Sequence, residues 1–176
     1  MRNTVLFIAM SLDGYIADAD GNVDWLSGQD DDVEGADGYA DFIKGMDTVI
    51  MGWTTYHQVV TELSPDQWVY DGLQSYVVTH RECVPRDGIS FVSEDPCVLV
   101  DRLRREPGKG IWICGGASII HQLMQGGLID EYRISIIPTI LGSGIRLFDT
   151  LNETRQLRLV SSTNDNGIVE LTYRKH

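Results

Sequence analysis

The chain has 176 residues, of which 43% are hydrophobic and 23% charged, and its formal net charge is −12. This length and composition fit a single globular domain over residues 1–176, and the negative charge argues against nucleic acid or an anionic membrane as the main partner. The three cysteines form no CxxC pair, and the apolar run at the N-terminus is too short for a secretion signal. We therefore expect a reduced, cytoplasmic protein without a structural zinc or another metal.

The first half of the chain predicts three strands and two helices. Val5–Met10 is a continuous apolar run, typical of a strand buried on both faces, whereas Ser11–Gln29 has no clear period and predicts a loop. Apolar residues at helical spacing predict a helix over Asp30–Met46. The next elements are a strand at Thr48–Met51, a helix from a possible cap at Thr54 to about Leu63, and a strand at 75–79.

The second half continues the alternation. Asp95 followed by Pro96 has the order of a helix start and predicts a helix to about Arg105. Further strands are expected at 89–92, 111–114 and 131–137, a helix after Gly115-Gly116, and a final hairpin around the turn at 164–167. Strands that alternate with helices favour a three-layer α/β domain, with a mostly parallel sheet, helices on both faces and an antiparallel hairpin at one edge.

The stretch "DADGNVDW", residues 18–25, resembles part of a calcium loop at first sight. In that template, oxygen ligands occupy the first, third, fifth and twelfth positions and a glycine occupies the sixth. With Gly21 at the sixth position, Ile16 falls at the first and Ser27 at the twelfth. The first ligand and the closing glutamate are both missing, so the spacing predicts no calcium site.

Two predicted strand-to-helix junctions contain glycines where a ligand would approach. They are "VIMGWTTY" (49–56), with Gly52, and "IWICGGASII" (111–120), with the Gly115-Gly116 pair. Ligands of parallel sheets bind beyond the carboxyl ends of the strands, and a residue without Cβ lets a phosphate touch backbone amides. The alternative is that these glycines only form tight turns.

A third strand end carries a hydroxyl, an imidazole and a guanidinium side by side, at Thr79, His80 and Arg81. Arginine beside a hydroxyl is suited to a phosphate monoester, such as the 2′-phosphate of NADPH. The alternative is a solvated basic turn.

Four motifs in this order resemble the dihydrofolate reductase-like superfamily, and most closely the reductase domain of bacterial riboflavin biosynthesis and its stand-alone relatives. The motifs are "VLFIAMSLDGYIA", "DTVIMGWTTY", "WICGGASIIHQLM" and "PTILGSGIRLF". The resemblance implies a twisted, mostly parallel sheet of about eight strands and NADPH as hydride donor. It implies a small heterocyclic or sugar-imine substrate, such as 5-amino-6-(5-phosphoribosylamino)uracil, a pterin or dihydrofolate. It also implies a homodimer, for which "YRISII" (132–137) and "LRLVSS" (157–162) are candidate interface strands.

Carried onto this chain, the resemblance assigns roles to individual residues. The implied cofactor contacts are Ala9 and Ile16 at the nicotinamide, Gly52, Thr54 and Thr55 at the diphosphate, Gly115, Gly116, Ala117, Ser118 and Ile119 at its other side, and Thr79, His80 and Arg81 at the adenosine phosphate. The implied substrate contacts are Asp13, Trp25, Gly142 and Ser143. Gly142 and Ser143 either offer amides to a ribose phosphate or belong to a bulged strand connection. Residues 18–25 correspond to the family's mobile loop, whose aspartates keep it solvated.

Asp30 is the candidate catalytic residue, because dihydrofolate reductases have a carboxylate five residues after the loop tryptophan, here Trp25. Acids at a helix start also simply offset the helix dipole. Trp53 stands where the family often has arginine, which removes one phosphate-binding cation. No HxE with PCxxC is present, so the chain cannot deaminate its substrate. The alternative to a reductase is a non-catalytic, dimeric nucleotide-binding module.

Overall fold

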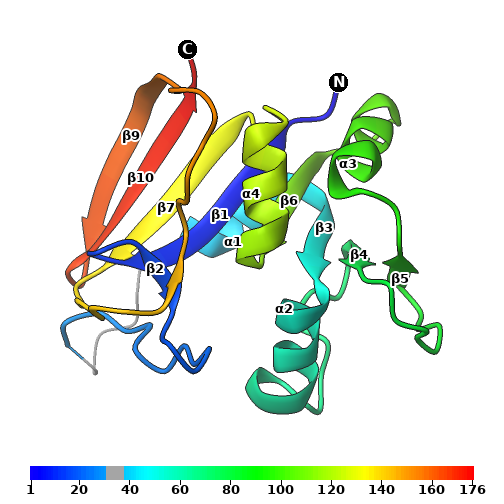
Figure 1. The fold of residues 1–176 in the computed structure, drawn as a ribbon, viewed down its shortest axis with the longest axis horizontal. Coiled ribbons are helices and arrows are strands. Elements are labelled where there is room, and N and C mark those ends of the chain that lie inside the picture. Colours follow the sequence, from blue (N-terminus) through cyan, green and yellow to red (C-terminus); the bar gives the residue numbers. More distant parts are fainter. Residues whose placement is uncertain (31–37) are drawn as a thin grey trace.

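The computed structural model describes residues 1–30 and 38–176, whose strands form an eight-stranded sheet and a separate two-stranded one (Figure 1). Across the large sheet, the strands follow the order β5 (Ile89–Val92), β4 (Gln74–Val78), β3 (Met46–Gly52), β6 (Gly110–Gly115), β1 (Thr4–Ser11), β7 (Glu131–Ile137), β10 (Ile168–Lys175) and β9 (Leu157–Asp165). The first six are parallel, and β10 runs antiparallel to both β7 and β9. The predicted mostly parallel sheet with a C-terminal antiparallel hairpin is confirmed.

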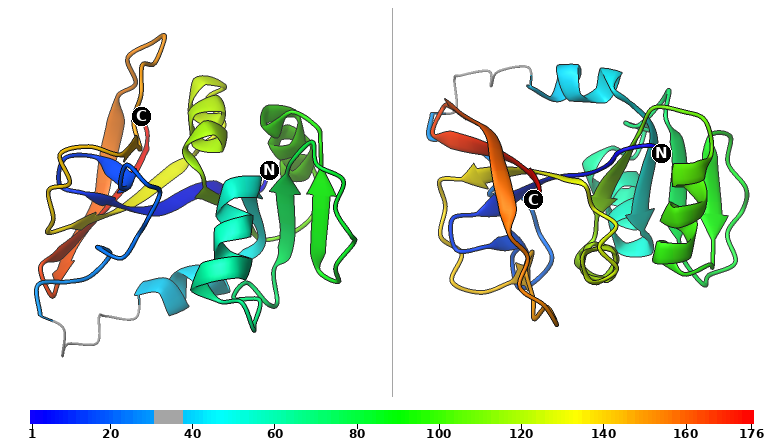
Figure 2. Two further views of the ribbon diagram at one scale, coloured as in Figure 1. Left: turned by 60° about the horizontal axis from the view of Figure 1, so that its bottom comes forward. Right: turned by 90° about the horizontal axis from the view of Figure 1, so that it is seen from above.

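Helices cover both faces of this sheet, which confirms the three-layer arrangement (Figure 2). The described helices are α1 (Gly38–Lys44), α2 (Trp53–Gln58), the π-helical turn η1 (Val59–Leu63), α3 (Pro96–Arg105) and α4 (Ala117–Gln125). α3 and α4 pack on one face, and α1 and α2 pack on the other. No helix in the described ranges is both long and apolar enough to cross a membrane.

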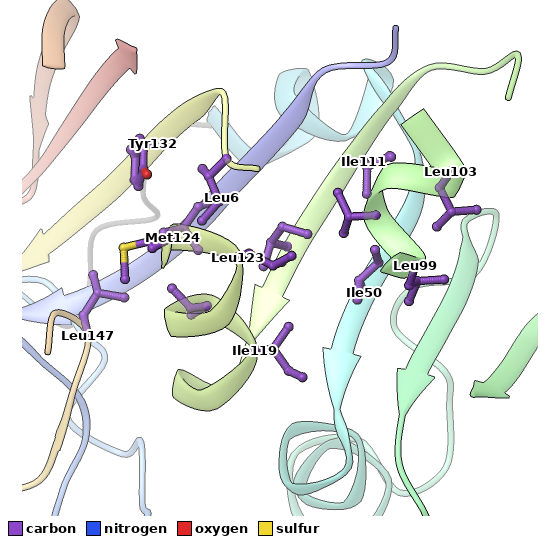
Figure 3. Close-up of a cluster of buried hydrophobic side chains, with 14 of the residues drawn as sticks. Leu6, Ile50, Leu99, Leu103, Ile111, Ile119, Leu123, Met124, Tyr132 and Leu147 are labelled. Carbon is purple, nitrogen blue, oxygen red and sulfur yellow. The ribbon is translucent and has the colours of Figure 1, made fainter. Parts of the chain in front are cut away.

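The buried strands are apolar throughout because each successive residue points to a different covered face. In β3, Ile50 packs in the core under α3 and α4, whereas its neighbours Val49 and Met51 pack in the core under α1 and α2. Leu6 of β1 and Leu123 of α4 belong to the first of these cores, and both are fully buried (Figure 3). Packing on both faces therefore fixes the central strands and the positions of their carboxyl ends.

The helix beginning at Pro96 has the predicted cap. The Asp95 carboxylate accepts hydrogen bonds from the backbone N–H groups of Cys97, at 2.7 Å, and Val98, at 3.3 Å. At α2 the predicted cap is wrong. Gly52 is the N-cap and Thr54 lies inside the helix, because the strand runs directly into the helix through the glycine.

Two other expectations need correction. The predicted loop over Ser11–Gln29 contains a short strand, β2 (Tyr15–Ala17), which pairs with β8 (Ile145–Arg146). Strands of two or three residues are too short to show an alternating pattern, so a pattern of hydrophobic residues cannot predict them. Of the predicted helix Asp30–Met46, the structure describes Gly38–Lys44 as helical, and residues 31–37 lie outside the described part.

One candidate dimer strand is also misplaced. "YRISII" lies in β7, which pairs with β1 on one side and β10 on the other, so it is no edge strand. "LRLVSS" lies in β9, the edge of the sheet, where Leu159 is 52% exposed and Val160 48% exposed. Among the two proposed segments, only β9 presents an open edge.

Candidate functional site

A cleft of about 530 Å³ lies at the carboxyl ends of the central strands. Both glycine-containing junctions line it, as does part of the loop that follows β2. Of the residues assigned to the cofactor, the cleft is lined by Ala9, Ile16, Gly52, Thr54, Thr55, Gly115, Gly116, Ala117, Ser118 and Ile119. The structure thus brings together residues from four separate stretches of sequence.

The two junctions contact each other closely. A Cβ added to Gly52 would lie 3.3 Å from Cγ1 of Ile119 and 3.8 Å from the backbone nitrogen of Gly116. A Cβ added to Gly116 would lie 3.3 Å from Oγ1 of Thr55. Gly115 has a φ of +139°, in the region that favours glycine, and its peptide bond to Gly116 is cis. A side chain at Gly52 or Gly116 would thus be crowded by the opposite junction, and the φ of Gly115 favours glycine.

The start of α4 is open to an anion. Gly116 is its N-cap, and no side chain among the described residues caps it. The first helical N–H groups have no partner within the helix, and they carry the positive end of the helix dipole. Since Ala117 and Ser118 line the cleft, this helix start can receive a phosphate there.

The third predicted strand end lies beside the cleft and does not line it. The guanidinium carbon of Arg81 is 5.1 Å from the ring centre of Trp53, which does line the cleft. The backbone N–H of Arg81 donates to Oγ1 of Thr79 at 3.1 Å, and His80 is exposed. Trp53, which lines the cleft, thus holds Arg81 beside it.

The 18–25 loop is ordered by one of its own aspartates. Oδ1 of Asp18 accepts hydrogen bonds from the backbone N–H groups of Asp20, at 2.9 Å, and Asn22, at 2.8 Å. The hydrogen bond from Asn22 is the main reason that the pKa of Asp18 is lowered. The carbonyl of Gly21 accepts from Nε2 of Gln58 at 3.0 Å, so the loop rests against α2 and helps to line the cleft. Asp18 therefore shapes the turn, a role beyond the solvation that we expected.

We expect no specific calcium binding by this loop, because the Asp18 carboxylate already serves backbone amides. Isothermal titration of metal-free protein with calcium should give no saturable heat. The matched variant is Asp20→Ala, since Asp20 is exposed and is one of the two template ligands present. A one-site isotherm that this substitution abolishes would contradict the prediction.

The residues assigned to the substrate do not line the cleft. Oδ2 of Asp13 accepts from the backbone N–H of Gly142 at 2.7 Å, and its Oδ1 accepts from Leu141 at 3.1 Å and from Oγ of Ser11 at 2.6 Å. The Ser11 hydroxyl, followed by these amides, lowers the pKa of Asp13.

Gly144, two residues after Gly142, is also packed closely against the chain around it. A Cβ added to Gly144 would clash with the carbonyl oxygen of Ala17. Together with the Asp13 contacts, this geometry favours the strand connection over a phosphate site for Gly142 and Ser143. Trp25 is half-buried in the loop, where its Nε1 donates to the carbonyl of Asn22 at 3.2 Å.

Asp30 lies away from the cleft, beside the turn between β9 and β10. Its backbone N–H donates to Oδ1 of Asn166 at 3.0 Å, and its carbonyl accepts from Nδ2 of Asn166 at 2.8 Å. The residue is exposed and does not line the cleft. Its position gives the catalytic hypothesis no geometric support.

We expect Asp30→Asn to leave turnover within about twofold of the wild type, because an exposed carboxylate outside the cleft does not contact a substrate bound there. The assay is the steady-state NADPH oxidation that the resemblance implies, and loss of a true general acid typically costs ~100-fold or more in rate. Asp101→Asn, an exposed carboxylate on α3, is the control for lost charge. A fall of that size confined to Asp30→Asn would restore its catalytic role.

Tyr70 and Cys114 line the cleft but were not identified as candidates from the sequence. The hydroxyl of Tyr70 lies 3.3 Å from Sγ of Cys114, and both residues line the cleft. Cys114 directly precedes Gly115, so the glycine pair already marked its place. Tyr70 comes from the irregular segment before β4, which carries no motif.

The comparisons with known proteins agree with this architecture. The family model of the RibD C-terminal domain matches residues 2–169. The chain is 40% identical to the uncharacterized protein YwjB of Bacillus subtilis (strain 168) over 175 residues, which cover 98% of this chain and 97% of that protein. It is 32% identical to YyaP of the same organism, also uncharacterized, over 98% of this chain and 94% of YyaP.

Solved structures show the same fold. A Shewanella sp. PV-4 protein assigned to riboflavin biosynthesis superimposes with a TM-score of 0.84 and 28% identity, over 99% of each chain. The deaminase/5-amino-6-(5-phosphoribosylamino)uracil reductase of Thermotoga maritima gives a TM-score of 0.72 at 14% identity. That match covers 99% of this chain but 57% of the Thermotoga chain, and at this identity it shows the fold alone. With the family model spanning nearly the whole sequence, this chain belongs to the RibD C-terminal domain family.

Proposed function

We propose that this protein is an NADPH-dependent reductase of a small heterocyclic or sugar-imine substrate, of the kind named for the Thermotoga protein. The observation that carries the proposal is the glycine-lined start of α4, where the uncapped helix N-terminus opens into the cleft. Anions bind at such helix starts, and glycine permits close approach to the backbone. Membership of the RibD C-terminal domain family supports a reductase of the riboflavin-pathway kind.

The residues present fit this cofactor. The amides of Gly116, Ala117 and Ser118 would hold its diphosphate, and Arg81, held by the face of Trp53, would meet the 2′-phosphate. Ala9 and Ile16 would contact the nicotinamide. When bound, NADPH supplies a hydride to the substrate. The chain's own residues then have to orient the substrate, exclude water and deliver a proton.

The loop after β2 is suited to excluding water. Val23 and Leu26 line the cleft, and the bond from Gln58 to Gly21 holds the same loop against α2. An apolar cover of this kind strengthens every polar contact beneath it, because it lowers the local dielectric constant.

A non-catalytic nucleotide-binding module is the second candidate, and one observation favours it. Among the described residues, no carboxylate, histidine, lysine or arginine lines the cleft. Such a module would bind NADPH and turn over nothing.

One assay separates the two candidates. Purified protein is mixed with NADPH and, in turn, 5-amino-6-(5-phosphoribosylamino)uracil, dihydrofolate and a pterin, and the absorbance of the reduced nicotinamide is followed. A reductase consumes NADPH in the presence of at least one of these compounds, above the rate without substrate. Saturable NADPH binding with no oxidation in any mixture would contradict the reductase and support the binding module.

We further propose that the protein is a homodimer that pairs through β9. Its open edge carries exposed Leu157, Leu159 and Val160, and an uncovered apolar edge strand favours association. Light scattering should give twice the 19.7 kDa mass of the chain, and Leu159→Lys should shift the protein toward the monomer. A wild-type monomer at high concentration would contradict this.

A further inference from the structure

The cleft has two chemically different ends, the start of α4 and the pair of Tyr70 and Cys114. The start of α4, with Gly116 and Ser118, belongs to the side where α4 packs. Tyr70 and Cys114 pack with the core under α1 and α2. Under the proposed function, the first end takes the phosphates, and the second is left for the reacting part of the substrate.

Two polar side chains of the cleft, Gln58 and Ser118, have hydrogen-bond partners of their own. Gln58 donates to the carbonyl of Gly21, and Oγ of Ser118 accepts from Nε2 of Gln122 at 3.2 Å. Thr55 lies against Gly116 at the phosphate end. The Tyr70 hydroxyl is different, because its one recorded partner among the described residues is the thiol of Cys114, a weak hydrogen-bonding group.

The ring of Tyr70 is held firmly. It packs edge-on against Trp112, with ring centres 5.2 Å apart, and against Trp68, with ring centres 5.1 Å apart. Trp112 is itself fixed, since its Nε1 donates to the carbonyl of Phe7 at 3.1 Å. A hydroxyl on a ring locked in this way keeps a constant position relative to β6, as a proton donor requires.

Both members of the pair are protonated at neutral pH. Burial raises the pKa of Cys114 to about 11, and burial followed by the proximity of Cys114 also raises the pKa of Tyr70. A protonated thiol can donate its S–H to the phenolic oxygen of Tyr70, and that leaves the phenolic O–H directed to another acceptor. In this arrangement the neutral pair presents one O–H donor to the cleft.

We propose that Tyr70 is the catalytic proton donor of the reductase and that Cys114 is the residue that positions its hydroxyl. This inference rests on the proposed function. The carbon of the substrate's C=O or C=N bond gains the hydride, and the electron pair of that bond moves to the oxygen or nitrogen. That atom takes the proton of the Tyr70 hydroxyl, and the phenolate regains a proton from water. The proton moves to the atom on which negative charge develops as the hydride arrives, so the donor acts where the reaction needs it.

The chemistry also restricts the substrate class. A donor of high pKa serves a reduction that places negative charge on oxygen or nitrogen, such as that of an open-chain sugar carbonyl or imine. A ring nitrogen that is protonated before the hydride arrives would not need it. We therefore expect the open-chain carbonyl or imine of an aminouracil sugar phosphate to be preferred over dihydrofolate.

The test uses Tyr70→Phe, with Tyr173→Phe on β10 as the matched control outside the cleft. With 5-amino-6-(5-phosphoribosylamino)uracil and NADPH, Tyr70→Phe should lower kcat roughly 100-fold and leave NADPH affinity unchanged, whereas the control should keep wild-type kcat. Cys114→Ala should lower kcat roughly 10-fold through misplacement of the hydroxyl. Cys114→Ser, which retains a donor, should recover most of that loss. A role in packing alone would not produce recovery by serine.

A second readout needs no turnover. The S–H stretching band of Cys114, assigned by difference from Cys114→Ser, should move to higher frequency in Tyr70→Phe, because the thiol loses its acceptor. Either an unchanged band or a Tyr70→Phe kcat close to that of an active wild type would overturn the inference and leave the reductase intact. A wild-type protein that oxidises NADPH with none of the substrates would contradict the proposed function, and the proton donor with it.

Discussion

Gly116→Val should weaken NADPH binding roughly 100-fold, which corresponds to about 2.8 kcal/mol. A Cβ at this position would already lie 3.3 Å from Oγ1 of Thr55, so the threonine must move before the larger valine fits. The added methyl groups would also occupy the cradle where the diphosphate is expected. Overpacking of this kind also typically lowers the free energy of unfolding by ~1–3 kcal/mol. Fluorescence titration with NADPH measures the loss directly.

Two variants control for this substitution. Gly116→Ala should cause a smaller loss, because only the Cβ is added. Gly45→Val, at the end of α1, places a Cβ 3.4 Å from the carbonyl of Phe42, in ordinary contact and outside the cleft. It should leave NADPH affinity unchanged. Full affinity in a folded Gly116→Val protein would exclude the start of α4 as the diphosphate site.

Arg81→Ala should weaken NADPH binding by about 1.5–3 kcal/mol, the scale of a hydrogen bond to a charged group, and should leave NADH binding nearly unchanged. The difference follows from the 2′-phosphate, which only NADPH carries. The guanidinium is held over the ring of Trp53 at the mouth of the cleft, where it can meet that phosphate. Titration of both nucleotides against the wild type and the variant gives the selectivity.

Arg105→Ala is the matched control. It removes the same charge from an exposed position on α3, where Arg105 pairs with Asp101. It should change the affinity for both nucleotides little, since exposed charges at a distance are screened by salt. Equal losses of NADPH and NADH affinity in Arg81→Ala would remove Arg81 from the phosphate role and assign it to the shared part of the nucleotide.

The main sheet was predictable because its strands are buried on both faces. The apolar run Val5–Met10 predicts a covered strand and lies within β1 (Thr4–Ser11), and the strand predicted at 131–137 is β7 with those bounds. The meeting of the two glycine junctions was predictable from the topology of the sheet. In a parallel sheet, residues that follow neighbouring strands meet at one edge. Gly52 and Gly116, 64 positions apart, accordingly lie near each other: a Cβ added to Gly52 would be 3.8 Å from the backbone nitrogen of Gly116.

The positions of the acids were not predictable, because long-range contacts decide them. Asp13 is bound to the amides of Leu141 and Gly142, and Asp30 to Asn166. Each pair joins segments more than a hundred residues apart. The residues next to either acid in the sequence therefore do not indicate its partner. The same holds for Tyr70, which reaches Cys114 from a segment without a motif. A local pattern locates a strand end, but packing decides which side chain comes to face it.

A crystal structure of the protein soaked with NADPH would show whether the cleft is the cofactor site. We expect one extended dinucleotide per chain, with its diphosphate against the first amides of α4 at Gly116 and Ala117. We expect the 2′-phosphate within hydrogen-bonding distance of Arg81 and the nicotinamide beside Ala9. Density for the nucleotide elsewhere on the surface, or none at a saturating concentration, would contradict this expectation.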